Sequence, residues 1–286
     1  MYDERLRIIP ATLGFIILSQ CKKHTETHDG TQPETAELHY NFSYGNHLQQ
    51  TMDVYVSFGL RDTIPLIVMV HGGNWIGHDK SDFSPRFERM RNFERYALIN
   101  INYRLDSTNA PPVPMQTDDI ALAIEKTKEI FHLKADRIGL MGMSSGGHIT
   151  AIYAYRYNID HNIKVLVNFV GPVDFNDPQY HTPGHWKRIF SGIEYIFGIP
   201  YIGNENYYAS VSPYSWIDAQ SPATILFYAG QDTLVPYSQG ERLHARLDSF
   251  SVTNEYYFYP NSSHPFNTPD TIDATLKAET FIRKNL

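Results

Sequence analysis

Short apolar runs alternate along most of the chain with stretches in which apolar residues recur at helical spacing. Residues 38–44 and 52–56 flank a polar turn and predict an antiparallel pair, the second strand alternating apolar and polar positions. Further buried strands are predicted by apolar runs at 65–70, 97–102, 137–141, 165–170, 223–230 and 256–259. This alternation predicts an α/β fold with a mostly parallel central sheet and helices on both faces.

Three of the intervening stretches have amphipathic character, and two of them show a clear helical period. The less regular stretch covers residues 83–96. In residues 116–131 the apolar positions, with charges between them, are Ile120, Ala123, Ile124, Ile130 and Phe131. A terminal helix is predicted over 271–285, and its apolar face carries Ile272, Leu276, Thr280 and Phe281.

The alternation of strand and helix breaks down between residues 171 and 221. A connection of about fifty residues is much longer than usual, so we expect an inserted cap after the sixth strand that shapes the substrate pocket. A helix is predicted within it over 184–196. Aromatic residues cluster at 195–216 and suggest an aromatic-walled cleft, although ordinary packing of each tyrosine is equally consistent with the pattern.

The strand predicted at 137–141 runs into a glycine-rich turn, and a helix is predicted over 148–157. The turn reads Gly142-Met143-Ser144-Ser145-Gly146-Gly147. Gly-x-Ser-x-Gly between a strand and a helix is the pattern of a nucleophile elbow, although a glycine turn without chemistry also gives it. Ser144 has a glycine two residues away on each side and is predicted as the nucleophile. The main-chain N–H of Ser145 is predicted as an oxyanion donor.

A second glycine turn follows the strand predicted at 65–70 and reads His71-Gly72-Gly73-Asn74-Trp75. Main-chain N–H groups stabilise a developing alkoxide only where no side chain blocks their approach, which favours glycine. Gly73 and Asn74 are therefore predicted to complete the oxyanion hole with Ser145. The alternative is a plain turn in which His71 packs structurally.

A serine nucleophile needs a base, and the base needs an acid that orients it. Asp232 follows the strand predicted at 223–230, and His264 follows the strand predicted at 256–259. Both residues stand just past strand ends, where a parallel sheet gathers its active site. The chain order Ser144, Asp232, His264 predicts a catalytic triad.

Asp174 is the competing acid, because it also follows an apolar strand. Asp232 is favoured over it, since only one helix and one strand separate its turn from His264. Most of the thirteen histidines have no such position in the fold. His71 belongs to the predicted oxyanion turn and His148 to the helix after the elbow, so neither is expected to be the base.

Residues 38–286 resemble an α/β-hydrolase of the esterase and lipase type, notably the hormone-sensitive-lipase-like carboxylesterases and the bacterial feruloyl or acetyl esterases. The matching motifs are His71-Gly72-Gly73, Asn102-Tyr103-Arg104, Gly142 to Gly146, Gly230-Gln231-Asp232 and Ser263-His264. The resemblance implies a serine esterase that cleaves short-chain or aromatic carboxylic esters, carbohydrate-linked esters included. Cleavage would pass through an acyl-enzyme intermediate.

The second glycine turn departs from the lipase pattern. Lipase-like members often have a third glycine there, whereas this chain has Asn74 followed by Trp75. The pattern His-Gly-Gly-x-Trp is similar to the turn of the kynurenine formamidases. An arylformamidase, an amidase or a peptidase-type acyl hydrolase with the same triad therefore stays open as an alternative.

Composition agrees with this class of protein. A chain of 286 residues with 42% hydrophobic content is long enough to bury one large α/β core. The formal net charge of −7 and the lack of a basic run argue against a nucleic acid partner. We expect a small-molecule ester as the partner, and no cofactor or metal.

The N-terminus differs from the rest of the chain. Residues 1–7 include Arg5 and Arg7, and the apolar stretch 8–18 follows, which is typical of a secretory signal over residues 1–21. That stretch is shorter than the about 20 residues that span a bilayer. Residues 22–37 are predicted to be a polar linker, and residues 38–286 the hydrolase domain with its cap at 171–221.

Cys21 is the single cysteine, and Leu18-Ser19-Gln20-Cys21 resembles a bacterial lipobox. We expect an exported lipoprotein, periplasmic or at the cell surface, whose contact with the membrane is a lipid on Cys21. A cleaved soluble form and an internal anchor are the alternatives. The corresponding measurement is incorporation of a palmitate analogue, which the substitution Cys21→Ser should abolish.

Overall fold

The computed structural model describes residues 36–57, 64–92, 96–105 and 111–286. The predicted signal over residues 1–21, its lipidation site Cys21 and nearly all of the predicted linker lie outside the described residues, so these stay predictions. No helix within the described ranges has both the length and the apolar character needed to cross a membrane.

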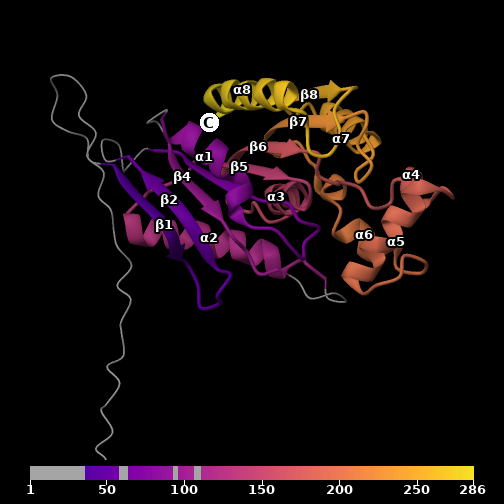
Figure 1. Cartoon of the computed structure of the whole chain (residues 1–286), viewed down its shortest axis with the longest axis horizontal. Coiled ribbons are helices and arrows are strands. Elements are labelled where there is room, and N and C mark those ends of the chain that lie inside the picture. The colour runs from indigo at the N-terminus through magenta and orange to yellow at the C-terminus, as the bar shows by residue number, and fades with distance from the viewer. Residues whose placement is uncertain (1–35, 58–63, 93–95, 106–110) are drawn as a thin grey trace, which may run out of the picture.

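One sheet forms the centre of the described part of the chain, with eight strands in the order β1-β2-β4-β3-β5-β6-β7-β8 (Figure 1). The strands are β1 (Glu37–Ser43), β2 (Thr51–Val56), β3 (Leu66–Val70), β4 (Ala97–Ile101), β5 (Ile138–Met143), β6 (Ile163–Phe169), β7 (Ala223–Ala229) and β8 (Asn254–Tyr259). The pairs β1–β2 and β2–β4 are antiparallel and the other pairs are parallel. The predicted antiparallel start and mostly parallel sheet are confirmed.

Helices connect the parallel strands and cover both faces of the sheet. They are α1 (Ser84–Arg91), α2 (Met115–Phe131), α3 (Ser145–Arg156), α4 (Pro178–His181), α5 (His185–Phe197), α6 (Glu205–Ser210), α7 (Ser238–Ser249) and α8 (Thr268–Asn285), with 3-10 turns η2 (Lys80–Phe83) and η3 (Pro213–Trp216). The helices predicted over 116–131 and 184–196 correspond to α2 and α5 within one residue at each end.

β3 contributes side chains to a hydrophobic core on each face of the sheet. Leu66, Val68 and Val70 pack with α2, α3 and α7, whereas Ile67 and Met69 pack with α1 and α8. Successive side chains of a strand point to opposite faces, so a strand covered on both faces is apolar throughout. This explains why the run at 65–70 is continuous and not alternating.

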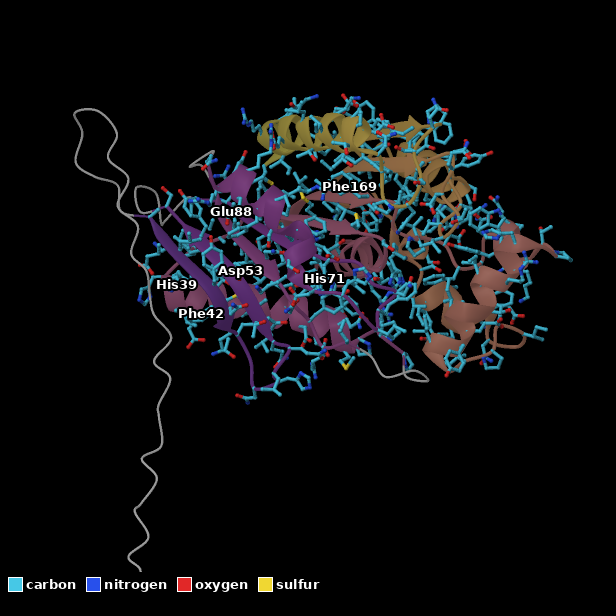
Figure 2. All side chains as sticks on the ribbon, in the orientation of Figure 1. His39, Phe42, Asp53, His71, Glu88 and Phe169 are labelled. Carbon is cyan, nitrogen blue, oxygen red and sulfur yellow. The ribbon has the colours of Figure 1, made fainter. Side chains whose placement is uncertain are left out.

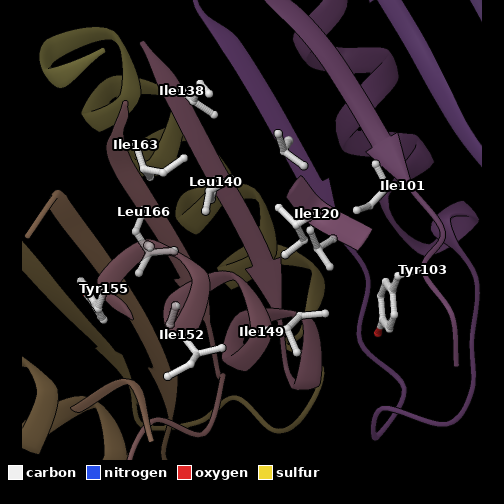
Figure 3. Close-up of a cluster of buried hydrophobic side chains, with 14 of the residues drawn as sticks. Ile101, Tyr103, Ile120, Ile138, Leu140, Ile149, Ile152, Tyr155, Ile163 and Leu166 are labelled. Atoms are coloured by element: carbon white, nitrogen blue, oxygen red, sulfur yellow. The ribbon is translucent and has the colours of Figure 1, made fainter. Parts of the chain in front are cut away.

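The core on the α3 side holds the helix that follows the elbow (Figure 3). Ile149 and Ile152 of α3 lie in the same core as Leu140 of β5 and Leu166 of β6, and all four are fully buried. Each such side chain contributes about 1.5–3 kcal/mol by leaving water. The burial of α3 therefore fixes the turn in which the predicted nucleophile lies.

Two predicted helical faces need correction. On α8, the predicted Phe281 is buried, but Ile272 and Leu276 are 54% and 46% exposed, and Ala274 and Ala278 lie in the core in their place. Alanine has a small side chain, so this face can lie close to the strands, and single apolar residues on the outer face are normal in folded proteins. On α2, Ile130 is likewise exposed, whereas the other predicted apolar positions of that helix are buried.

The segment between β6 and β7 contains α4, α5, α6 and η3. Of these, α4, α5 and α6 lie together at the right-hand end of the molecule in Figure 1. The rings of this segment pack mainly on one another. Tyr208 is fully buried and contacts the rings of Phe175, Phe190 and Phe197. An aromatic core of its own thus stabilises this segment on the edge of the molecule.

Candidate active site

The turn between β5 and α3 contains a single residue, Ser144. Its φ of 55° and ψ of −125° form a backbone conformation that residues other than glycine rarely adopt. The Ser144 N–H donates to the Phe169 carbonyl oxygen at 2.8 Å, and the Ser144 carbonyl oxygen accepts from the His148 N–H at 3.0 Å. Main-chain hydrogen bonds therefore hold the turn in its strained conformation.

One glycine is required on each side of Ser144, at positions 142 and 146. A Cβ atom on Gly146 would lie 2.3 Å from the carbonyl oxygens of Val70 and His71, and one on Gly142 would lie 2.3 Å from the Gly146 carbonyl oxygen. Such distances are far inside van der Waals contact, and the neighbours are backbone atoms that cannot rotate away. The absence of side chains lets the elbow pack directly against the end of β3.

The turn after β3 brings its main chain to the same place. Gly73 has φ of 118°, and a Cβ atom there would lie 2.1 Å from the Gly77 carbonyl oxygen. Asn74 follows with φ of 53° and lines the same cavities as Ser144. Ser145 is the first residue of α3, where an N–H has no acceptor within the helix. The structure thus gathers the predicted oxyanion donors around Ser144.

The motif Asn102-Tyr103-Arg104 packs against the turn after β3. The Tyr103 hydroxyl donates to the His71 carbonyl oxygen at 2.9 Å, and the two rings stack with centroids 4.5 Å apart. Arg104 binds the fully buried carboxylate of Asp119. His71 Nδ1 donates to the Gly72 carbonyl oxygen, and burial lowers the pKa of His71. His71 is therefore held by packing against Tyr103 and by its hydrogen bond within the turn.

Asp232 and His264 meet across the ends of β7 and β8. His264 Nδ1 donates to Asp232 Oδ2 at 2.7 Å, and both side chains are almost fully buried. The other carboxylate oxygen of Asp232 accepts from the main-chain N–H groups of Leu234 and Val235. With its proton on Nδ1, the imidazole has a lone pair on Nε2, and His264 lines the same cavity as Ser144.

Asp174, the competing acid, has other partners. Its carboxylate is buried and accepts two hydrogen bonds from the Arg242 guanidinium. Its main-chain N–H donates to the Gln239 side chain, which ties the start of the β6–β7 segment to α7. Of the two acids weighed from the sequence, the structure brings only Asp232 to His264.

Trp75 connects the second glycine turn to the helix after the elbow. Its indole Nε1–H donates to His148 Nδ1 at 3.0 Å, and His148 Nε2 donates to the Val211 carbonyl oxygen at 2.8 Å. The Trp75 ring also packs edge-on against Phe197 of α5. The sequence marked Trp75 only as a departure from a motif; its structural role is to join the two turns and the β6–β7 segment.

Full burial lowers the pKa of His148 from 6.5 to about 4. Between these values the unfolded chain binds a proton that the folded protein does not, so stability falls as the pH decreases through this range. We expect a loss of roughly 3 kcal/mol in the free energy of unfolding from this group alone. The variant His148→Gln keeps a donor and an acceptor but cannot titrate.

Urea unfolding of the wild type and of His148→Gln between pH 7 and pH 4 measures this effect. Other groups titrate equally in both proteins, so only the difference between the two curves reports on His148. We expect the wild type to lose stability faster than the variant as the pH falls. Parallel curves would show that burial of His148 does not oppose its protonation.

Two cavities meet at Ser144. The larger has a volume of about 540 Å³, and His264, Asp82 and Arg86 are among its lining residues. The smaller has a volume of about 160 Å³ and lies between Ser144 and three isoleucines of α5, namely Ile189, Ile193 and Ile196. Neither cavity is lined by an aromatic residue from 195–216, so the predicted aromatic cleft is wrong at these positions.

The sequence missed the residues that form these walls. The isoleucines of α5 follow a helical period that is equally typical of a core-facing helix, and nothing in the pattern distinguishes the two. Arg86 lies in an ordinary amphipathic stretch. In the part of the chain that the structure describes, no group of three or more His, Cys, Asp or Glu side chains could hold a metal ion.

The chain is similar to proteins of known family. A family model described as BD-FAE matches residues 52–247. The chain is 22% identical over 217 residues to dipeptidyl aminopeptidase BIII of Pseudoxanthomonas mexicana, which covers 72% of this chain and 31% of that protein. It is 24% identical over 243 residues to the probable carboxylic ester hydrolase LipM of Mycobacterium tuberculosis, covering 79% and 56%. The chain thus spans only about a third to a half of these relatives' lengths.

Solved structures agree on the fold. A truncated carbohydrate esterase from gut microbiota superposes with a TM-score of 0.66 at 17% identity, covering 91% of this chain and 100% of that one. Esterase 2 of Thermogutta terrifontis with propionate bound superposes with a TM-score of 0.67 at 19% identity, covering 87% and 94%. The predicted α/β-hydrolase fold is confirmed.

Proposed function

This chain belongs to the BD-FAE family, which groups with the α/β-hydrolase esterases, and on this basis we propose that it hydrolyses carboxylic esters through an acyl-enzyme on Ser144. The observation that carries the proposal is the hydrogen bond between His264 and Asp232 beside the cavity that Ser144 lines. A strained serine turn, a base with a fixed tautomer and a glycine turn at one place are the parts that acyl transfer needs.

In the proposed mechanism, Ser144 Oγ attacks the ester carbonyl carbon while His264 Nε2 takes the hydroxyl proton. Asp232 holds the proton on Nδ1 and stabilises the imidazolium that forms. The N–H groups of Gly73, Asn74 and Ser145 donate to the oxyanion. The C–O bond to the alcohol then breaks, and the leaving alkoxide takes the proton from His264. Water, deprotonated by His264, then attacks the acyl carbon. The bond between that carbon and Ser144 Oγ breaks, Oγ takes the proton back from His264, and the acid leaves.

The position of His264 supports an assignment of one cavity to the alcohol portion of the ester and of the other to the acyl portion. The alcohol portion must leave beside the group that protonates it, and His264 lines the larger cavity and not the smaller one. The acyl group then occupies the smaller cavity against the isoleucines of α5. This assignment gives the predicted cap a role in acyl selection and limits the acid to a short chain.

The comparisons support both halves of this assignment. The Thermogutta terrifontis esterase is described with propionate bound, which is a short acid. The gut microbiota protein is described as a carbohydrate esterase, and a sugar that supplies the alcohol of an ester is large and polar. We therefore propose short-chain esters of a bulky, polar alcohol as the substrate class.

A panel of p-nitrophenyl esters and matching anilides tests the proposed function. Acetate and butyrate esters should be hydrolysed, the octanoate ester should react poorly because the smaller cavity cannot hold it, and the anilides should react far more slowly. If the anilides react faster than the esters, ester hydrolysis is rejected as the main activity. The amidase alternative that the His-Gly-Gly-x-Trp turn raised would then be favoured.

Gly192 on α5 offers a direct test of the acyl cavity. It lines this cavity, and a Cβ atom built on it meets no other atom within 4 Å. The substitution Gly192→Leu should therefore fill the cavity without disturbing the fold. We expect kcat/KM for the butyrate ester to fall relative to the acetate ester by about tenfold or more, since that is the cost of misfitting even one methylene.

Ser191→Leu is the matched control for Gly192→Leu. Ser191 is the neighbouring residue on α5, but its side chain is exposed and bonded to the Lys187 carbonyl oxygen. The control should leave the ratio of butyrate to acetate unchanged. An equal change in both variants would mean that this cavity does not receive the acyl group.

A further inference from the structure

Arg86 lines the larger cavity together with Ser144 and His264. It lies on α1, and its guanidinium is held over the rings of Phe83 and Phe169, at 5.2 Å and 5.0 Å from their centroids. Figure 2 labels Phe169, which ends the strand β6. Two aromatic faces thus fix a positive charge in the wall of the cavity.

Among the residues that the structure describes, none accepts a hydrogen bond from Arg86. Its Nε is buried without a partner, and no carboxylate pairs with it. The next arginine on the same helix behaves differently, because Arg89 binds the carboxylate of Glu279. Burial without an anion also lowers the pKa of Arg86. An anion beside Arg86 would satisfy donors that the protein leaves open.

The other side chains of this wall that can carry a charge and that are discussed above already have partners. Asp82 accepts from His78 Nδ1 at 2.8 Å, and His264 donates to Asp232. Among the described residues of this wall, Arg86 is therefore the one charged group without a counter-ion. It lines the larger cavity, which we assign to the leaving alcohol.

We propose that Arg86 binds a carboxylate carried by the alcohol portion of the ester, so that the enzyme prefers esters of hydroxy acids or acidic sugars over neutral ones. This inference rests on the proposed function, because it uses the assignment of the larger cavity to the alcohol. The planar guanidinium fork matches a carboxylate, which it can bind with two parallel hydrogen bonds. A single cation with Asp82 on the same wall favours a monoanion over a doubly charged phosphate.

The test uses two esters with the same acetyl group, 3-acetoxybenzoate and its neutral methyl ester. We expect Arg86→Gln to lower the ratio of kcat/KM for the anionic ester to that for the neutral ester by about tenfold to a hundredfold. The change should lie mainly in KM for the anionic ester, and the neutral ester should be affected much less. Arg86→Lys should restore part of the ratio, because it keeps the charge without the fork.

Arg89→Gln is the matched control, because Arg89 lies one turn further along α1 and outside the cavity. It should leave the ratio unchanged. Inhibition of the wild type supplies a test that needs no variant: 3-hydroxybenzoate should inhibit more strongly than its methyl ester, and added salt should narrow the difference.

The outcomes separate this inference from the proposed function. If the wild type hydrolyses both esters and Arg86→Gln leaves their ratio unchanged, the anion site is overturned and ester hydrolysis stands. Equal inhibition by 3-hydroxybenzoate and its methyl ester would also overturn the anion site. If the wild type hydrolyses p-nitrophenyl acetate but neither acetoxybenzoate, the inference is overturned and ester hydrolysis stands. If it hydrolyses none of the three esters, ester hydrolysis itself fails, and the inference fails with it.

Discussion

Replacing Ser144 with alanine is expected to reduce hydrolysis of p-nitrophenyl acetate to background while the protein stays folded. The loss should be on the order of 10⁶ in kcat, which is typical when the nucleophile of such a triad is removed. Folding should survive because main-chain hydrogen bonds to Phe169 and from His148 hold the turn, and alanine retains both. Initial rates and circular dichroism together measure the two parts of this prediction.

Ser145→Ala is the control for the choice of serine. It removes the neighbouring hydroxyl but keeps the main-chain N–H that is proposed as an oxyanion donor. We expect this variant to keep most of its activity and to remain labelled by a serine-directed fluorophosphonate, whereas Ser144→Ala should not be labelled. Retained turnover in Ser144→Ala would reject the nucleophile assignment.

Asp232→Asn is expected to have the second largest effect. An asparagine amide in this position can donate to Nδ1, which would place the imidazole proton on Nε2 and leave His264 unable to accept a proton from Ser144. A tautomer error of this kind costs about 10⁴ in kcat in a Ser-His-Asp triad. The measurement is kcat for the acetate ester, with the melting temperature as a check on folding.

Asp174→Asn is the comparison that separates the two acids. Asp174 pairs with Arg242 and joins the β6–β7 segment to α7, so we expect a lower melting temperature and little change in kcat. Should Asp174→Asn lose activity to the same extent as Asp232→Asn while remaining folded, the assignment of the acid would have to be revised.

Much of the active site could be predicted from short sequence motifs because its geometry is set locally. Gly142 and Gly146 are required because a Cβ atom at either position would lie 2.3 Å from a main-chain oxygen, so the sequence must have glycine at both positions. The ends of the strands can also be predicted from the sequence, since strands buried on both faces are apolar throughout. The fold class and the positions of Ser144, Asp232 and His264 at strand ends follow from these two signals.

The tertiary structure decided which groups meet and which faces are covered. Asp174 and Asp232 both follow strands, but only Asp232 contacts His264, because Arg242 of α7 binds the other carboxylate. Ile272 and Leu276 have the spacing of a core stripe, yet both are exposed, and α8 packs through its alanines and Phe281. The sequence favours Asp232 without showing the contact, and it does not tell the covered face of α8 from the exposed one. Only the packing of distant elements decides both.

The sequence by itself determined the α/β sheet, the glycine turns and the order of the predicted triad, because each depends on neighbours a few residues away. The walls of the two cavities were decided only by tertiary structure. The isoleucines of α5 and the guanidinium of Arg86 come from segments far apart in the chain, and they face Ser144 because burial of the aromatic core and of α1 places them there. Side chains that only tertiary packing brings together have no recognisable pattern in the local sequence.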